Sequence, residues 1–155
     1  MRSLDAWLDE YADSHQNPAN KRLHYLCVPA IQLALMGLLW AIPVPAAVGG
    51  WSLWVNWSAL LALAALLYYA ALSPRLALGM LVVVVAGYAL LLALERLPAP
   101  LWAACVAIFV VAWVGQFIGH ALEGKRPSFF KDVQFLLIGP LWLLAALYRR
   151  IDLRY

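Results

Sequence analysis

The three histidines of the chain, His15, His24 and His120, are the residues whose type and position could carry chemistry. Imidazole nitrogens bind zinc, iron, copper and nickel, and three of them around one ion leave coordination positions open for a substrate. Two of these histidines lie near the start of the chain and the third lies near its end. They form one site only if the fold brings both ends of the sequence together.

Polar residues at helical spacing accompany two of the histidines. Asn20 and His24 are four residues apart, and Gln116, His120 and Glu123 follow one another at i, i+4 and i+7. Each set therefore shares one face of a helix. Polar side chains in an apolar helix are costly and usually face the interior of a bundle. Both sets predict a common site in that interior.

We expect this site to contain metal ligands, a carboxylate and several polar or basic residues. The predicted metal ligands and catalytic residues are His15, His24 and His120. Glu123 is a further catalytic candidate, which either binds the ion or accepts a hydrogen bond from a histidine. The residues predicted to contact a substrate or to orient a ligand are Asn20, Gln116, Lys21, Arg22 and Arg126. Cys27, three residues after His24, is an alternative ligand.

Plainer interpretations exist for each residue taken alone. A single histidine at the end of a membrane helix is more often hydrogen-bonded than a ligand, and Asn20 could cap a helix. Glu123 could pair with Lys125 or Arg126, and the cations could do no more than set the orientation of the helices. The joint pattern favours a shared metal site, because every histidine belongs to it. The ligand types alone do not decide between iron and zinc.

The composition predicts that membrane-spanning helices position these residues. The chain of 155 residues is 66% hydrophobic and 12% charged, which is about half the charge of a typical soluble domain. No charged side chain occurs from residue 27 to 74 or from 97 to 119. Apolar runs of about 18 residues or more are typical of transmembrane helices. The net charge of +3 is modest and no nucleic-acid-binding motif is present, so we expect no nucleic-acid partner.

We expect an all-α, polytopic membrane helical bundle that forms one domain over residues 1–155. An amphipathic helix is predicted over 3–15, and Asn17-Pro18 ends it. Four spans are predicted at about 21–41, 52–72, 76–94 and 100–123. The apolar segment 133–148, which we expect to break at Gly139-Pro140, is short for a straight span. It is interpreted as re-entrant or interfacial, with a fifth crossing helix as the alternative.

The distribution of lysine and arginine predicts the orientation of this bundle. With four spans, one side collects Arg2, Lys21, Arg22, Arg75, Lys125, Arg126 and Lys131, and the other side has Arg96. The positive-inside rule makes the first side cytoplasmic. All three histidines lie at that side. The membrane would be the inner membrane of a bacterium, or the endoplasmic reticulum in a eukaryote.

Two motifs resemble those of a known family. The first is Tyr11-x3-His15-x4-Asn20-x3-His24-x4-Pro29. The second is Gln116-x2-Gly119-His120-x2-Glu123-x3-Pro127. They look like the N-terminal and C-terminal motifs of the family named for the metabolism of phytosphingosine to odd-numbered fatty acids. The resemblance covers both ends of the chain, with apolar segments between them.

The resemblance implies an Fe(II)-dependent dioxygenase that acts on 2-hydroxy fatty acids in alpha-oxidation. Such an oxidoreductase uses O2, releases the carboxyl carbon as CO2 and leaves a fatty acid shorter by one carbon. The implied cofactor is Fe2+, and the implied partners are a 2-hydroxy fatty acid, O2 and the lipid bilayer. His15, His24 and His120 would then correspond to the family's metal-binding histidines, and Asn20 and Glu123 to further motif positions.

Two other classes of function stay open. A metal-dependent lipid hydrolase could use the same histidines with zinc to activate water, and it would be indifferent to O2. A non-catalytic membrane scaffold or a small transporter is the other alternative. Ion-coupled transporters place ionisable residues near the membrane midplane, and the second and third predicted spans contain no Asp, Glu, Lys or Arg.

Overall fold

A computed structural model describes residues 2–48, 50, 52–127 and 133–155. Within this part of the chain the protein is all-helical and contains no strand, which confirms the predicted fold class. The elements are α1 (Leu4–Asp13), α2 (Pro18–Trp40), a 3-10 helix (Ala46–Val48), α3 (Trp57–Leu72), α4 (Pro74–Leu94), α5 (Leu101–Glu123) and α6 (Phe135–Arg150). Lys131, which entered the orientation argument, lies outside the described residues.

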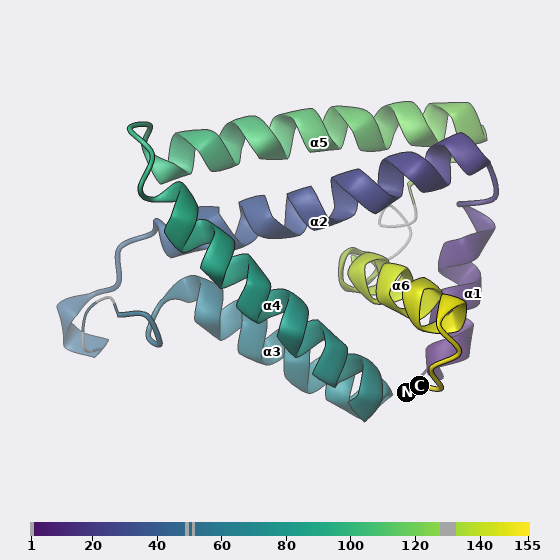
Figure 1. The fold of residues 1–155 in the computed structure, drawn as a ribbon, viewed down its shortest axis with the longest axis horizontal. Coiled ribbons are helices and arrows are strands. Elements are labelled where there is room, and N and C mark those ends of the chain that lie inside the picture. The colour runs from purple at the N-terminus through teal and green to yellow at the C-terminus, as the bar shows by residue number, and fades with distance from the viewer. Residues whose placement is uncertain (1, 49, 51, 128–132) are drawn as a thin grey trace.

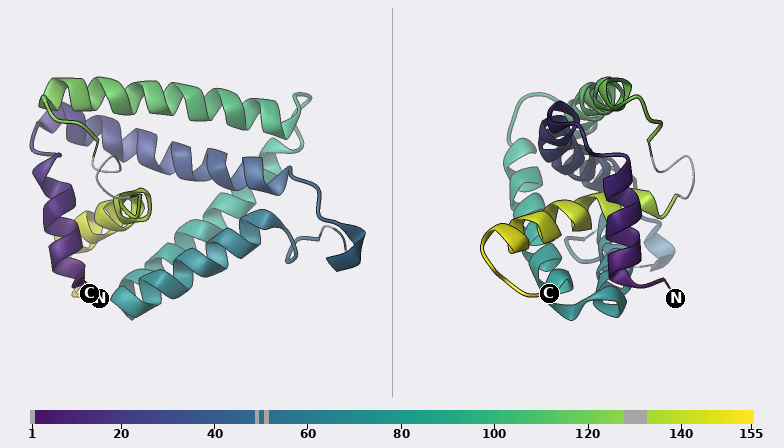
Figure 2. Two further views of the ribbon diagram at one scale, coloured as in Figure 1. Left: turned by 180° about the vertical axis from the view of Figure 1, so that it is seen from behind. Right: turned by 90° about the vertical axis from the view of Figure 1, so that its right-hand side faces the viewer.

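The helices form two pairs that are inclined to each other. In Figures 1 and 2, α2 and α5 lie side by side along the molecule, while α3 and α4 form a second pair that runs obliquely to the first. Helices α1 and α6 pack together at the end where α2 begins and α5 ends. This arrangement brings the two ends of the chain to one end of the α2–α5 pair.

Helices α2, α4 and α5 are long and apolar enough to cross a membrane. Helix α3 is equally apolar but has only 16 residues. At about 1.5 Å per residue it reaches roughly 24 Å, less than the ~30 Å hydrocarbon core of a bilayer. A fourth crossing over 52–72 therefore stays a prediction.

The cap of α2 corrects one sequence prediction. The side chain of Asn17 accepts a hydrogen bond from the Ala19 amide at 2.8 Å, and Pro18 occupies the first helical position. Proline suits that position because its missing N–H has no intrahelical partner there. The alternative interpretation of Asn20 as a helix cap is wrong, since Asn20 lies inside α2 and is fully buried.

Caps also set the starts of α3 and α4. Asn56 caps α3 through its side chain, so this helix begins at Trp57 rather than at residue 52 as predicted. Ser73 caps α4 by accepting from the Leu76 amide at 3.3 Å. Helix α4 therefore begins two residues earlier than predicted, because a side-chain oxygen satisfies an otherwise unpaired amide.

Helix α6 is continuous, so the predicted break at Gly139-Pro140 is wrong. Pro140 lies inside the helix and removes only the hydrogen bond that its N–H would donate to the Leu136 carbonyl. The C-terminal end of α6 and the residues after it contact two other helices. Arg150 donates to the hydroxyl of Tyr25 in α2 at 3.4 Å, and Arg75 of α4 donates to the Arg154 carbonyl at 3.4 Å. The re-entrant or interfacial character of this segment stays a prediction.

Small residues let α2 and α5 approach closely. A Cβ added at Gly115 would lie 2.6 Å from the sulfur of Cys27, and one at Gly37 would collide with the sulfur of Cys105. Glycine at such positions allows helix backbones to pack tightly where lipid cannot drive association. Both cysteines thus fill the helix interface opposite a glycine.

We predict that Gly115→Ala destabilises the helix pair and that a second change, Cys27→Ala, restores it. The added methyl group overlaps the Cys27 sulfur, and overpacking of this kind costs about 1–3 kcal/mol. Removing the sulfur makes room for the methyl group, so the two changes should couple favourably. Equilibrium unfolding in mixed detergent micelles measures the effect. A stable single variant, or a double variant no better than the single, would contradict this packing.

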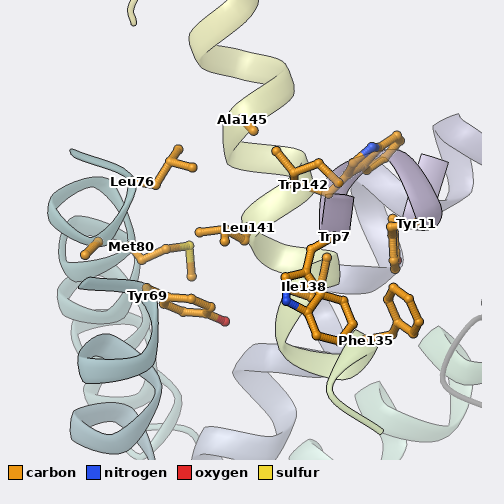
Figure 3. Close-up of a cluster of buried hydrophobic side chains, with 12 residues drawn as sticks. Trp7, Tyr11, Tyr69, Leu76, Met80, Phe135, Ile138, Leu141, Trp142 and Ala145 are labelled. Atoms are coloured by element: carbon orange, nitrogen blue, oxygen red, sulfur yellow. The ribbon is translucent and has the colours of Figure 1, made fainter. Parts of the chain in front are cut away.

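A hydrophobic cluster joins α6 to the rest of the molecule. Figure 3 shows side chains of α6 between those of α3 and α4 on one side and those of α1 on the other. Its central members Ile138 and Leu141 are fully buried. Trp7 and Phe135 meet edge to face, with ring centroids 5.1 Å apart. The cluster fixes α1 and α6 beside the start of α2, where the first two histidines lie.

Candidate metal centre

The three histidines come together in the protein interior. His15 lies between α1 and α2, His24 lies in the second turn of α2, and His120 lies in the last turn of α5. Their ring centroids are 4.2, 5.0 and 4.9 Å apart, and all three side chains are buried. One ring nitrogen from each lies within 4.8 Å of the others, in a group that could hold a metal ion.

Backbone carbonyls orient two of the rings. His15 Nδ1 lies 2.6 Å from the Tyr11 carbonyl oxygen, and His24 Nδ1 lies 3.0 Å from that of Asn20. A carbonyl can only accept, so each Nδ1 carries the proton and donates it. Each Nε2 then keeps its lone pair, which is the arrangement found in metal-binding histidines.

The donor atoms of this group fit a metal ion. His15 Nε2 and His120 Nδ1 are buried and have no hydrogen-bond partner among the described residues. A buried polar atom left without a partner costs about 1–3 kcal/mol, and a bound cation would remove that cost. Ligands about 2.1 Å from one ion lie no more than roughly 4.2 Å apart. The three nitrogens lie within 4.8 Å of one another, slightly more than that limit.

Burial keeps the His15 ring in the form that binds metals. Burial, reinforced by the neighbouring His24, lowers the pKa of His15 to about 3. The imidazole is therefore neutral at neutral pH, and neutral imidazole is the ligand form. Tyr11 stacks on this ring, with centroids 4.2 Å apart and planes 11° apart. Trp142 of α6 packs against it with a centroid distance of 5.4 Å, so the ring has little freedom to turn.

Glu123 binds the backbone at the start of α2. One carboxylate oxygen accepts from the Gln16 amide at 2.8 Å, and the other accepts from the Asn17 amide at 2.8 Å and from the Asn20 side-chain amide at 3.0 Å. The N-terminus of a helix favours a negative charge. The carboxylate thus ties the end of α5 to the turn that carries His15. It is not part of the histidine group that could hold a metal.

Asn20 lies between the turn before α2 and the end of α5. Its side-chain amide also donates to the Ser14 carbonyl at 3.1 Å. Its Oδ1 atom lies so close to Gly119 that a Cβ there would collide with it. Asn20 therefore connects the turn before α2, the body of α2 and the last turns of α5.

An apolar cavity of about 290 Å³ begins at the histidines and continues between the helices. All three histidines and Gln116 line it. Residues farther along it include Val28, Gln32, Met36, Ala62, Val84 and Phe109. Ligand pockets of proteins are typically of this size or larger and mostly apolar. The cavity suits a molecule with a polar head at the histidines and an apolar remainder.

The predicted cationic residues are absent from the described lining of this cavity. Lys21, Arg22 and Arg126 are not among the described residues that line it. Arg22 and Arg126 are exposed, and Lys21 is half-buried. Their contact with a substrate stays a prediction. Cys27, the alternative ligand, packs against Gly115.

Sequence reasoning missed several contacts that orient the rings. The Tyr11 and Asn20 carbonyls lie four residues before His15 and His24, a spacing that could have predicted both hydrogen bonds. The contact of Trp142 with His15 had no signal in the sequence, because the position of α6 depends on the packing of the whole molecule.

The fold and the site together define a class of protein. It is all-helical, three of its helices are long and apolar enough to cross a membrane, and a buried group of three histidines could bind a metal ion. The chain belongs to the Mpo1-like family, whose model is described as 2-hydroxy-palmitic acid dioxygenase Mpo1-like and matches residues 1–151. No curated protein and no solved structure matches the chain.

Proposed function

We propose that the protein is a non-haem Fe(II)-dependent dioxygenase that shortens 2-hydroxy fatty acids by one carbon. The observation that supports this most is the group of three buried imidazoles at the end of an apolar cavity. A metal held by three nitrogens keeps positions open for a substrate and O2. The family description names 2-hydroxy-palmitic acid, a molecule with one polar end and a long apolar tail.

The proposed reaction balances with O2 as the sole oxidant. A 2-hydroxy acid and O2 give the acid shorter by one carbon, CO2 and water. The bond between C1 and C2 breaks, C1 leaves as CO2, and C2 is oxidised from a secondary alcohol to a carboxyl group while O2 is reduced. Fe(II), when bound, would supply the redox chemistry with O2 that the organic groups of the protein lack.

In this proposal, different residues bind the metal, bind the substrate and position the histidines. His15, His24 and His120 would hold the metal, and the cavity would exclude water and take the alkyl tail. Burial of that tail contributes about 0.8 kcal/mol per CH2. Gln116 offers an amide to the substrate head, since it lines the cavity together with the histidines. Glu123 and Asn20 keep His15 in place through the turn that they bind.

We further propose that the protein is a multi-pass membrane protein with the metal site at the cytoplasmic face. Lysine and arginine gather near the ends of the helices that carry the histidines, as the positive-inside rule requires of cytoplasmic loops. Lys21, Arg22 and Arg126 would attract a fatty acid carboxylate to that face. The membrane would be the inner membrane in a bacterium or the endoplasmic reticulum in a eukaryote.

An anaerobic purification followed by metal and oxygen controls tests the proposed function. The protein is reconstituted with Fe(II) or with Zn(II) and incubated with 2-hydroxypalmitic acid, with and without O2. We expect a product shorter by one carbon and CO2 from C1 only with Fe(II) and O2. Lipid hydrolysis that needs zinc and proceeds without O2 would instead identify a hydrolase. Absence of metal binding would leave a non-catalytic membrane protein.

A further inference from the structure

The cavity runs along the helices rather than across them. Its lining on α2 extends from His24 to Met36, twelve residues that span about 18 Å at ~1.5 Å per residue. Its lining on α5 extends from His120 to Phe109 in the opposite direction along the chain, over roughly 16 Å. The two helices lie side by side. The histidines therefore occupy one end of the cavity, and Met36 and Phe109 lie at the other.

Buried and hydrogen-bonded residues close the far end. Met36, Ser58 and Val84 line the cavity there and are at most 8% exposed. The Tyr88 hydroxyl donates to the Ser58 hydroxyl at 3.3 Å. Behind that bond the ring of Trp40 packs on Tyr88, with centroids 5.3 Å apart. A tail that enters from the histidines meets these packed side chains at the far end. Leu35 and Leu61, which line the same end, are 40% and 38% exposed, so the cavity is less closed on their side.

Gly87 of α4 determines how far the Met36 side chain can withdraw from the cavity. A Cβ added at Gly87 would lie 3.1 Å from Cε and 3.3 Å from Sδ of Met36. These distances are tighter than ordinary contacts, so a side chain at residue 87 would push the end of Met36 away. Gly87 is not among the described residues that line the cavity. A change there can alter the cavity only through Met36.

We propose that Met36, seated against Gly87, is the residue that limits the length of the alkyl tail. This inference rests on the proposed function, because it places the polar head of the substrate at the histidines. Extended chains advance about 3.5 Å per three bonds, or roughly 1.2 Å per bond. A cavity about 18 Å long therefore holds a straight chain of roughly 15 bonds. Methionine suits the position, because its flexible side chain fills irregular space.

Chain-length profiles of two variants test this inference. The probe for binding is a series of straight-chain saturated fatty acids, which displace a fluorescent fatty acid from the full-length protein in lipid nanodiscs without metal or O2. Met36→Ala opens the far end and should move the optimum to tails longer by about two carbons. Gly87→Ala pushes Met36 into the cavity and should move the optimum to tails shorter by about one carbon. Each methylene that no longer fits should weaken binding about fourfold, the equivalent of ~0.8 kcal/mol.

Matched variants keep the test interpretable. Val85 lies on α4, as Gly87 does, but it is 60% exposed and outside the described cavity lining. Val85→Ala should therefore leave the chain-length profile unchanged. Met36→Leu keeps the side-chain volume with a shorter reach, so it should lengthen the optimum slightly even if Met36→Ala does not fold.

The turnover of 2-hydroxy acids by the same variants separates the two proposals. Shifted binding profiles without dioxygenase activity would refute the proposed function and retain Met36 as the limit on tail length. Dioxygenase activity with identical profiles in all variants would overturn the role of Met36, because the tail would then leave the cavity sideways into lipid. Failure of the wild-type protein both to bind any fatty acid and to turn over 2-hydroxy acids would overturn both.

Discussion

Alanine in place of His15, His24 or His120 is expected to abolish binding of the proposed metal ion and, with it, the proposed turnover. Each histidine contributes one nitrogen to a group within 4.8 Å, and two nitrogens hold a divalent ion far more weakly than three. Loss of a residue that merely orients a ligand costs about 10- to 100-fold in metal affinity, so loss of a ligand should cost at least about 100-fold. Elemental analysis of the purified variants measures the metal, and release of CO2 measures turnover.

The control for these variants is Leu26→Ala. Leu26 lies on α2 close to His24 but is 74% exposed, so its truncation should leave metal content and activity unchanged. Circular dichroism should show that the histidine variants keep their helices, because the glycine contacts between α2 and α5 do not involve the histidines. A histidine variant that binds the metal as tightly as the wild type would remove that residue from the site.

Glu123→Ala is expected to lower metal affinity about 10- to 100-fold without changing the kind of ligands around the ion. The change leaves three donors without their acceptor: the amides of Gln16 and Asn17 and the side chain of Asn20. Hydrogen bonds to charged groups contribute about 1.5–3 kcal/mol each, so the turn that carries His15 would be held to α5 more weakly. The bond from the Asn17 side chain to the Leu122 carbonyl would remain. Titration with Fe(II) measures the affinity, and X-ray absorption spectroscopy of the loaded protein reports the ligands.

Two further variants give this experiment its controls. Glu123→Gln retains one acceptor oxygen, so its loss of affinity should lie between those of the wild type and the alanine variant. Glu10→Ala removes a surface carboxylate that pairs with Arg2 at 2.6 Å, and exposed pairs contribute at most about 1 kcal/mol. Unchanged affinity in Glu123→Ala would contradict the positioning role. Loss of an oxygen ligand from the absorption spectrum would make Glu123 a ligand itself.

The local features of the fold followed from the sequence because they depend on neighbouring residues. Apolar runs predicted helices close to α2, α4 and α5, and the amphipathic helix predicted over 3–15 is present as α1. One error, the cap of α2, arose because two residues suit the same role. Asn17 and Asn20 were both suitable caps for α2, and the proline at residue 18 favours the first.

The contacts of α6 could not be predicted in the same way. Its sequence is apolar and contains Pro140, which suggested a broken segment of uncertain placement. In the structure its buried face packs between α1 and the α3–α4 pair, and this packing maintains a continuous helix despite the missing hydrogen bond. Trp142 reaches His15 only as a result of that placement.

The sequence by itself determined that His15, His24 and His120 fall at one end of an apolar helical bundle, because the number and direction of the helices follow from local hydrophobic patterns. Only the tertiary structure decided that the three rings face one another and that Glu123 binds the amide of Gln16, 107 residues away along the chain. Contacts between distant segments depend on how side chains of several helices fill space together. That packing also shapes the cavity. No local sequence pattern indicates where the far end of the cavity lies.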